Sequence, residues 1–349
     1  MIDIDGSMME GGGQLLRMAT SYSAILGEPI HVYNIRAKRK DPGLKPQHLT
    51  TIIAASEISS AELSGASLGS TEITFSPNRI RGGAYSFDIG TAGSISLFLQ
   101  CLNPILLFGD KSSTISVRGG TAVTWSPPIP FLENIVYKTL GAMDASSELS
   151  VERHGFYPRG GGEVSQHTRD VSVIQPLLLG EPAIKKIRGV SICGALPEHV
   201  AVRQAESAKK RLNELRYKSV ITPIVAEPTP HSPGSLICLW AEGENIFMGA
   251  DCLGARGKSA EEVGAEAAVK LIKEIRSGAN LDQHNTDHLI LPMSLADGVS
   301  RVRTNMITFH TLTAIKVAQI FTDAKFTVHG REGEPGTIEV EGIGLQNRG

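Results

Sequence analysis

The stretch Thr308-Phe-His-Thr-Leu-Thr-Ala-Ile-Lys-Val-Ala-Gln-Ile-Phe321 is predicted to form a helix with a histidine in its first turn. Apolar residues recur along it at three-residue spacing, which predicts one buried face: Leu312, Ile315, Ala318 and Phe321. Thr308 is the predicted N-cap, so His310 lies near unpaired backbone N–H groups and the positive end of the helix dipole. That environment favours an anion and a neutral imidazole, which can attack a phosphorus atom placed beside it. Polar residues are common at helix starts, so a histidine that only caps or packs is the simpler interpretation of this stretch alone.

The composition is that of a globular protein. Of the 349 residues, 41% are hydrophobic and 20% are charged, and the formal net charge is −2. Any contact with nucleic acid must therefore come from a local basic patch. The N-terminus carries acids where a signal peptide needs basic residues, and the most apolar region, 97–108, is too short to span a bilayer. We expect a soluble intracellular protein without membrane contact, cytoplasmic or, in a eukaryote, nucleoplasmic, and the sequence leaves its oligomeric state open.

The order of predicted strands and helices repeats along the chain. Helices are predicted at 13–26, 47–61, 93–102, 130–140, 200–217, 259–276, 285–295 and 308–321. Strands lie between them, and a strand at 171–177 is predicted to open a third unit. The predicted fold is α/β (α+β), with three βαβα-ββ units in a large domain of residues 1–183 and 279–349. Residues 184–278 are long enough for a smaller α/β domain inserted in the third unit.

Two features suggest phosphate binding before any comparison is made. Glycine-rich turns precede two of the helices, at 10–14 and 90–94, and glycine lets backbone N–H groups approach an oxyanion closely. The loop 35–48 concentrates cations around the single acid Asp41, namely Arg36, Lys38, Arg39, Lys40 and Lys45. Arg17, one turn into the first helix, could join them. A solvated charge run is the usual explanation of such a loop, but its concentration in a near-neutral chain favours phosphate contacts.

The segment Arg153-His-Gly-Phe-Tyr-Pro-Arg-Gly-Gly-Gly-Glu-Val164 closely resembles the signature of the RNA 3'-terminal phosphate cyclases. The resemblance extends, in order along the chain, to segments 5–17, 35–48, 291–296 and 309–315. It covers essentially the whole sequence. The family's fold also consists of three repeats with an inserted small domain.

The resemblance implies an ATP-dependent reaction on an RNA that ends in a 3'-phosphate. His310 matches the family's nucleophile, which attacks the α-phosphorus of ATP, releases pyrophosphate and carries AMP on nitrogen. The AMP passes to the RNA, giving an RNA(3')pp(5')A end. Attack by the neighbouring 2'-hydroxyl then yields a 2',3'-cyclic phosphate. The enzyme is thus expected to be an RNA 3'-terminal-phosphate cyclase of the nucleotidyl-transfer ligase type.

The same match assigns expected roles to other residues. Phosphates of ATP or of the RNA end are expected to contact Arg17, Arg36, Arg39 and Gln47. The nucleotide pocket is expected to include Gln100, Pro128, His284, Asp287 and His288. Glu10 is expected to help hold Mg²⁺ or Mn²⁺, for which a carboxylate oxygen is a suitable ligand.

The segment His284-Asn-Thr-Asp-His288 departs from the family pattern, which usually has tyrosine and glutamine at its two ends. An imidazole at His284 offers adenine a smaller π surface than a phenol ring, and His288 replaces an amide. We expect that ATP is still used, with modest affinity and looser discrimination against GTP. A zinc site formed by the two histidines with Asp287 is an alternative, although it lacks a fourth ligand.

Two other functions stay open at this point. Cyclase-like proteins that act as non-catalytic binding modules in ribosome assembly share the scaffold but lack the catalytic histidine, which His310 matches here. Enolpyruvyl transferases build a related architecture from similar repeats, and fold analogy alone does not decide function.

Overall fold

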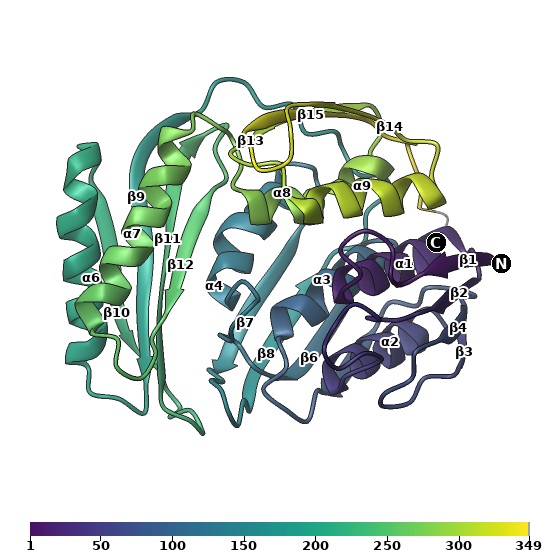
Figure 1. Ribbon diagram of the computed structural model, residues 1–349, viewed down its shortest axis with the longest axis horizontal. Coiled ribbons are helices and arrows are strands. Elements are labelled where there is room, and N and C mark those ends of the chain that lie inside the picture. The colour runs from purple at the N-terminus through teal and green to yellow at the C-terminus, as the bar shows by residue number, and fades with distance from the viewer. Residues whose placement is uncertain (348–349) are drawn as a thin grey trace.

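The computed structural model describes residues 1–347 and has a mixed α/β fold, which confirms the predicted class. Figure 1 shows sheets on the outside of a group of helices, with a further sheet and two helices to one side. Within residues 1–347, no helix combines the length and the apolar composition needed to cross a membrane.

Two sheets have the same strand order. The first sheet runs β1 (Ile2–Asp5), β2 (Ile30–Tyr33), β4 (Ile73–Ser76), β3 (Glu62–Ser64). The second runs β5 (Ala84–Asp88), β6 (Ser113–Gly119), β8 (Gly162–Thr168), β7 (Ser147–Arg153). In each sheet the first two strands are parallel and the remaining neighbours are antiparallel. The third sheet has three antiparallel strands, in the order β13 (Val299–Thr304), β15 (Gly336–Glu341), β14 (Lys325–His329).

The predicted strand at 171–177 is wrong. Its backbone groups pair one at a time with separate elements instead of forming a ladder. Val171 donates its N–H to the carbonyl of Leu107 (2.8 Å), and Leu177 donates to Ser300 Oγ (3.0 Å). Pro176 has no N–H to give. A single parallel bridge between Leu178 and Arg301 is the nearest approach to a fourth strand beside β13.

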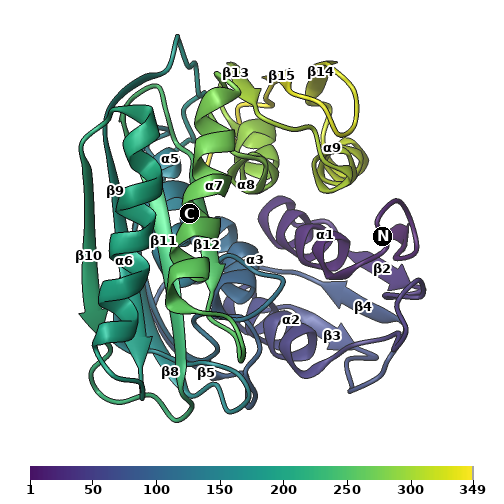
Figure 2. The same cartoon turned by 60° about the vertical axis from the view of Figure 1, so that its left-hand side comes forward.

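The central helices are α1 (Gly13–Leu26), α2 (Pro46–Ile58), α3 (Ile95–Leu107), α8 (Gln283–Leu295) and α9 (Phe309–Phe321). Figures 1 and 2 both show them enclosed by the sheets. Helices α1 and α3 are buried almost all round, as expected of helices without a polar face. Strands such as β6 instead alternate buried and exposed residues, as expected of an outer layer.

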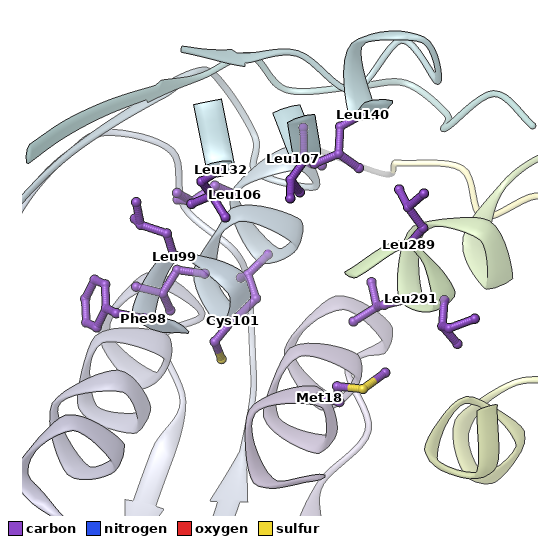
Figure 3. Close-up of a cluster of buried hydrophobic side chains, with 14 of the residues drawn as sticks. Met18, Phe98, Leu99, Cys101, Leu106, Leu107, Leu132, Leu140, Leu289 and Leu291 are labelled. Atoms are coloured by element: carbon purple, nitrogen blue, oxygen red, sulfur yellow. The ribbon is translucent and has the colours of Figure 1, made fainter. Parts of the chain in front are cut away.

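The core closes where α1, α3 and α8 meet. Figure 3 shows Met18 and Leu291 close together between α1 and α8, with Leu99 of α3 in the same cluster of buried apolar side chains. The helix predicted at 130–140 completes this core but is not regular. It consists of α4 (Ile129–Phe131), the π-helical turn η1 (Leu132–Val136) and α5 (Tyr137–Gly141).

The chain from 183 to 276 builds its own sheet and core. Its elements are β9 (Ala183–Gly194), α6 (His199–Leu212), η2 (Asn213–Leu215), β10 (Ser219–Val225), β11 (Gly234–Glu244), β12 (Gly249–Leu253) and α7 (Ala260–Arg276). The sheet order is β10-β9-β11-β12, and Figure 1 shows α6 and α7 on one face of it. A separate apolar cluster, including Ile187, Leu239 and Leu271, lies between that face and the two helices. The segment overlaps the predicted insert 184–278, whose independence as a domain stays a prediction.

Candidate active site

His310 lies in the first turn of α9 and is held by a side chain from α1. Its Nδ1 is 2.8 Å from Gln14 Oε1, and Gln14 Nε2 donates to the His310 carbonyl oxygen at 3.2 Å. The amide can satisfy both contacts only with its oxygen toward the ring, so Nδ1 carries the proton and donates it. The lone pair is then on Nε2, which is the tautomer required for nucleophilic attack.

The start of α9 is fixed by a capping network, and Thr308 is its N-cap as predicted. Thr308 Oγ1 accepts from the Thr311 N–H at 2.9 Å, and both threonine hydroxyls donate to Asp287 Oδ1, at 2.9 and 2.5 Å. Asp287 therefore joins α8 to the turn that carries His310. Burial raises the pKa of Asp287 to about 7, against the opposing effect of the two hydroxyl donors.

The predicted buried face of α9 is too narrow. Leu312 and Phe321 are only half-buried, whereas Thr311, Ala314 and Val317 are fully buried. The reason is that α9 packs against both α1 and α8, so two of its faces are covered. Phe321 still contributes by stacking on Tyr22, with ring centroids 5.3 Å apart.

Arg17 is buried in the first turns of α1, and His48 lies half-buried beside the start of that helix. Arg17 donates to Gln100 Oε1 from Nε (3.2 Å) and Nη2 (3.0 Å), so two residues expected in the site are in direct contact. Burial lowers the pKa of Arg17 to about 10, and the group stays cationic at neutral pH. Burial and then the charges of Arg17, Arg36 and Lys45 lower the pKa of His48 to about 3, so His48 is neutral.

Gly13 permits this arrangement. A Cβ there would lie 2.4 Å from His48 Nε2 and 3.1 Å from Arg17 Nη1. The N-cap of α1, Gly12, has no side-chain hydrogen bond, so no side chain caps this helix start. Backbone N–H groups without a capping side chain at a helix start favour an anion.

Glu10 and Arg39 form an ion pair above the same helix start. The Glu10 side chain is only 13% exposed, and its backbone N–H donates to Thr313 Oγ1 on α9 at 3.4 Å. A Cβ at Gly12 would lie within 2.7 Å of both partners of the ion pair. The two expected ligand-binding residues thus neutralise each other in this state.

Arg36 and Gln47 bind the protein's own backbone. Arg36 Nη1 donates to the carbonyls of Asp41 (2.9 Å) and Gly43 (2.8 Å), which closes the basic loop on itself. Gln47 Oε1 accepts the Ser94 N–H at 2.8 Å and so ties α2 to the glycine turn before α3. These contacts assign both side chains a role in shaping the site, and their predicted contacts with phosphate stay predictions.

The residues predicted for the nucleotide base lie on α8 and the loop before α4. Pro128 is buried at the N-cap of α4, and the Phe131 ring meets His284 edge-on, with centroids 6.3 Å apart. Desolvation by the surrounding protein lowers the pKa of His284 to about 4 and that of His288 to about 3, so both rings are neutral. His288 lines a largely apolar pocket whose rim includes Arg17, Gln100 and Asp287.

His310 itself remains accessible to solvent. The surrounding protein nevertheless lowers its pKa below the ordinary value of 6.5, first by desolvation and then through the charges of Arg17 and Arg39. His310 is thus a neutral, solvent-exposed histidine beside two arginines, where the starts of α1 and α9 meet. Such a histidine can attack an anionic electrophile through the lone pair on Nε2.

Comparison with known proteins identifies the family. A sequence profile described as RNA 3'-terminal phosphate cyclase matches residues 8–328. The chain belongs to the RNA 3'-terminal phosphate cyclase family. Proteins named RNA 3'-terminal phosphate cyclase from Desulfurococcus amylolyticus and Ignicoccus hospitalis are 45% and 43% identical to it. The alignments cover 99% and 98% of this chain, and 99% of each relative.

One solved structure, of EPSP synthase from Acinetobacter baumannii, aligns with 93% of this chain and 62% of its own. The TM-score is 0.27 and the identity 10%, values that support neither a shared fold nor a shared function.

Glu10 is the expected metal ligand in this cyclase-family chain. Its carboxylate offers the hard oxygen that Mg²⁺ or Mn²⁺ prefers. Residues 1–347 contain no group of three or more His, Cys, Asp or Glu side chains placed to hold a metal ion. His284, Asp287 and His288 therefore do not form such a group. A divalent ion at this position would take one ligand from Glu10, in place of Arg39, and the rest from substrate phosphates and water.

Sequence reasoning assigned no role to Gln14 or His48, although both lie in the segments that resemble the cyclase family. The signal available was their position: Gln14 is in the first turn of α1 after the glycines, and His48 follows the basic loop. The contact of Gln14 with His310 joins residues 296 positions apart and has no local signature.

Proposed function

We propose that this chain converts an RNA 3'-terminal phosphate to a 2',3'-cyclic phosphate with ATP, through AMP carried on His310. The observation that carries the proposal is the Gln14 contact, which places the lone pair of the neutral imidazole on Nε2. Desolvation and the charges of Arg17 and Arg39 lower the pKa of His310 and so favour that neutral form. Membership of the cyclase family supplies the substrate class.

Each step exchanges one bond to phosphorus for another. Nε2 of His310 forms a bond to the α-phosphorus of ATP as the bond to pyrophosphate breaks. An oxygen of the RNA 3'-phosphate then attacks the same phosphorus, and the P–N bond breaks to return the electron pair to Nε2. The RNA 2'-hydroxyl finally attacks the 3'-phosphorus, loses its proton and expels AMP. The histidine divides one difficult displacement into easier ones.

The surrounding residues bind charge and hold geometry. Arg17 and Arg39, with the uncapped N–H groups of α1, would stabilise the phosphate oxygens as charge develops on them. Asp287 and Thr308 keep the first turn of α9 in place, so His310 keeps its direction. A divalent ion held at Glu10 would neutralise further phosphate charge. Arg39 would have to leave Glu10 for both to act, which couples metal and phosphate binding.

The nucleobase would lie between the Pro128 loop and the first turn of α8. His284 offers it a neutral imidazole face beside Phe131. The smaller ring supports the expectation of modest ATP affinity and weak discrimination against GTP.

The test uses a 3'-phosphorylated RNA oligonucleotide with ATP and Mg²⁺ or Mn²⁺, followed by mass spectrometry of the RNA. We expect the RNA to lose one water, as cyclisation requires. The matched control carries a 2'-deoxy nucleotide at its 3' end, lacks the attacking hydroxyl and should stop at the adenylylated end. RNA that stays unchanged in every nucleotide and metal combination would favour a non-catalytic binding module instead.

A further inference from the structure

Two aromatic side chains stand out from the surface. Trp125 is 97% exposed and Tyr157 is 77% exposed, the highest values for large apolar or aromatic side chains within residues 1–347. Side chains of this size normally bury most of their area, because exposing them to water is unfavourable. Their exposure therefore needs an explanation other than packing.

Each side chain projects from a turn that is closed at its base. The Ile129 N–H donates to the Thr121 carbonyl at 3.0 Å, so the loop around Trp125 leaves the fold and returns. Trp125 itself has φ of 67°, a conformation that costs energy for a bulky residue. The Gly160 N–H donates to the Phe156 carbonyl at 2.8 Å and closes the turn that carries Tyr157.

The two turns are anchored to each other. Ala122 and Phe156 form a parallel bridge, and the Thr121 N–H donates to the Gly155 carbonyl at 2.9 Å. Trp125 lies three residues beyond one side of this bridge and Tyr157 one residue beyond the other. They extend the ends of β6 and β8, which are neighbours in the second sheet (Figure 1).

The turns also border the candidate active site. Gly160 packs so closely on the glycine turn before α3 that a Cβ there would lie 2.7 Å from the Ala92 Cα. That same turn is held by Gln47 through the Ser94 N–H. On the other side, the Trp125 loop leads directly into Phe131 and its contact with His284.

A positive charge accompanies the two rings. Arg159 is exposed on the Tyr157 turn, and its guanidinium makes no ion pair with any residue in 1–347. Exposed aromatic rings beside a cation are the features that bind single-stranded nucleic acid, because every base has a π face and every linkage a negative charge.

We propose that Trp125 and Tyr157 form a stacking platform for the bases that precede the 3'-phosphate of a single-stranded RNA, with Arg159 binding its backbone. The proposal rests on the proposed function for the position of the RNA end. It adds a binding site for the RNA nucleotides that precede that end. Stacking of this kind tolerates any sequence, so the platform selects an unpaired end rather than a particular base.

The test is the fluorescence of Trp125 in a Trp240→Phe protein, where it is the only tryptophan. A 3'-phosphorylated decanucleotide should quench it, and a 3'-phosphorylated mononucleoside should not. Trp125→Ala should weaken binding of the decanucleotide about tenfold, a loss typical of one base–aromatic stack. Trp125→Phe should restore most of the affinity. Tyr217→Ala, which removes a partly exposed aromatic ring next to β10, should have no effect.

Labelling of the protein by ATP without RNA separates this proposal from the proposed function. We expect Trp125→Ala to become adenylylated at the wild-type rate. Equal affinity of Trp125→Ala and wild type for the decanucleotide, or quenching by ATP alone, would overturn the platform. If RNA quenches Trp125 but the wild-type protein never becomes adenylylated, the proposed function is overturned and the platform is supported.

Discussion

At the scale of single residues, the reactivity of His310 depends on Gln14. The amide oxygen accepts a hydrogen bond from Nδ1–H, and the amide nitrogen donates one to the carbonyl oxygen of the same histidine, so ring orientation and tautomer are set together. A histidine at a helix start without such a partner would divide its population between two tautomers.

Gln14→Ala should therefore slow adenylylation of the protein by roughly tenfold or more, because both tautomer and ring orientation are lost. Gln14→Glu keeps an acceptor for Nδ1–H but adds a negative charge, which stabilises the imidazolium. It should retain activity at high pH and lose it earlier than wild type as the pH falls. Single-turnover labelling measured across pH distinguishes the two variants from each other and from wild type. Equal rates for wild type, Gln14→Ala and Gln14→Glu would exclude this role of Gln14.

The pH dependence follows from the lowered pKa of His310. Desolvation, Arg17 and Arg39 all disfavour the imidazolium, so the acid limb of adenylylation should have its midpoint below the ordinary histidine value. Arg39→Gln removes one positive charge and leaves Glu10 unpaired, and both changes raise the pKa of His310. The acid limb should move to higher pH in this variant. Lys40→Gln, in the same loop, is the control and should not shift the midpoint of the acid limb.

At the scale of elements, the contact between α8 and α9 positions the nucleophile. Asp287 accepts from two hydroxyl groups of the α9 cap, and its pKa is raised to about 7. Because the folded pKa lies above the unfolded value of about 3.9, this group contributes stability at low pH. That contribution is lost as the pH rises through about 7.

Asp287→Asn keeps an acceptor for both threonines and cannot ionise. Relative to wild type, its free energy of unfolding should therefore rise between pH 5 and pH 8, by roughly 1 to 3 kcal/mol. Chemical denaturation at the two pH values gives the difference directly. Equal destabilisation of Asp287→Asn at the two pH values would show that the Asp287 carboxyl is ionised at both and that the α9 cap needs its charge.

The basic loop is a second element, and the Arg36 side chain helps to hold its shape. Arg36 donates to two carbonyls of its own loop, and its backbone has a φ of 55°. Arg36→Ala should lower the free energy of unfolding by roughly 1 to 3 kcal/mol, the range for hydrogen bonds from a charged group. Lys40→Ala should change it by less than about 0.5 kcal/mol. Equal melting temperatures for the two variants would make Arg36 an ordinary surface cation.

At the scale of the whole molecule, the structural features that depend on local sequence pattern could be predicted. The bounds of α1 are as predicted, because Gly12 and Gly27 flank an unbroken helical stretch. The strand at 171–177 failed because its partners are distant elements that no local pattern specifies. The same holds for the site. The helix start made His310 a candidate, and the resemblance to the cyclases assigned it the role of nucleophile. The contact of His310 with Gln14, and that of Gln47 with Ser94, arise only from the packing of distant segments.

His310 carries AMP in the proposed reaction, and one measurement tests this claim most directly. Wild-type protein and His310→Ala are incubated with ATP labelled at the α-phosphate, without RNA, and the label on the protein is measured before and after acid treatment. We predict label on wild type that acid removes, as a P–N bond requires, and none on the variant. Label that survives in His310→Ala, or an acid-stable adduct on wild type, would contradict the account.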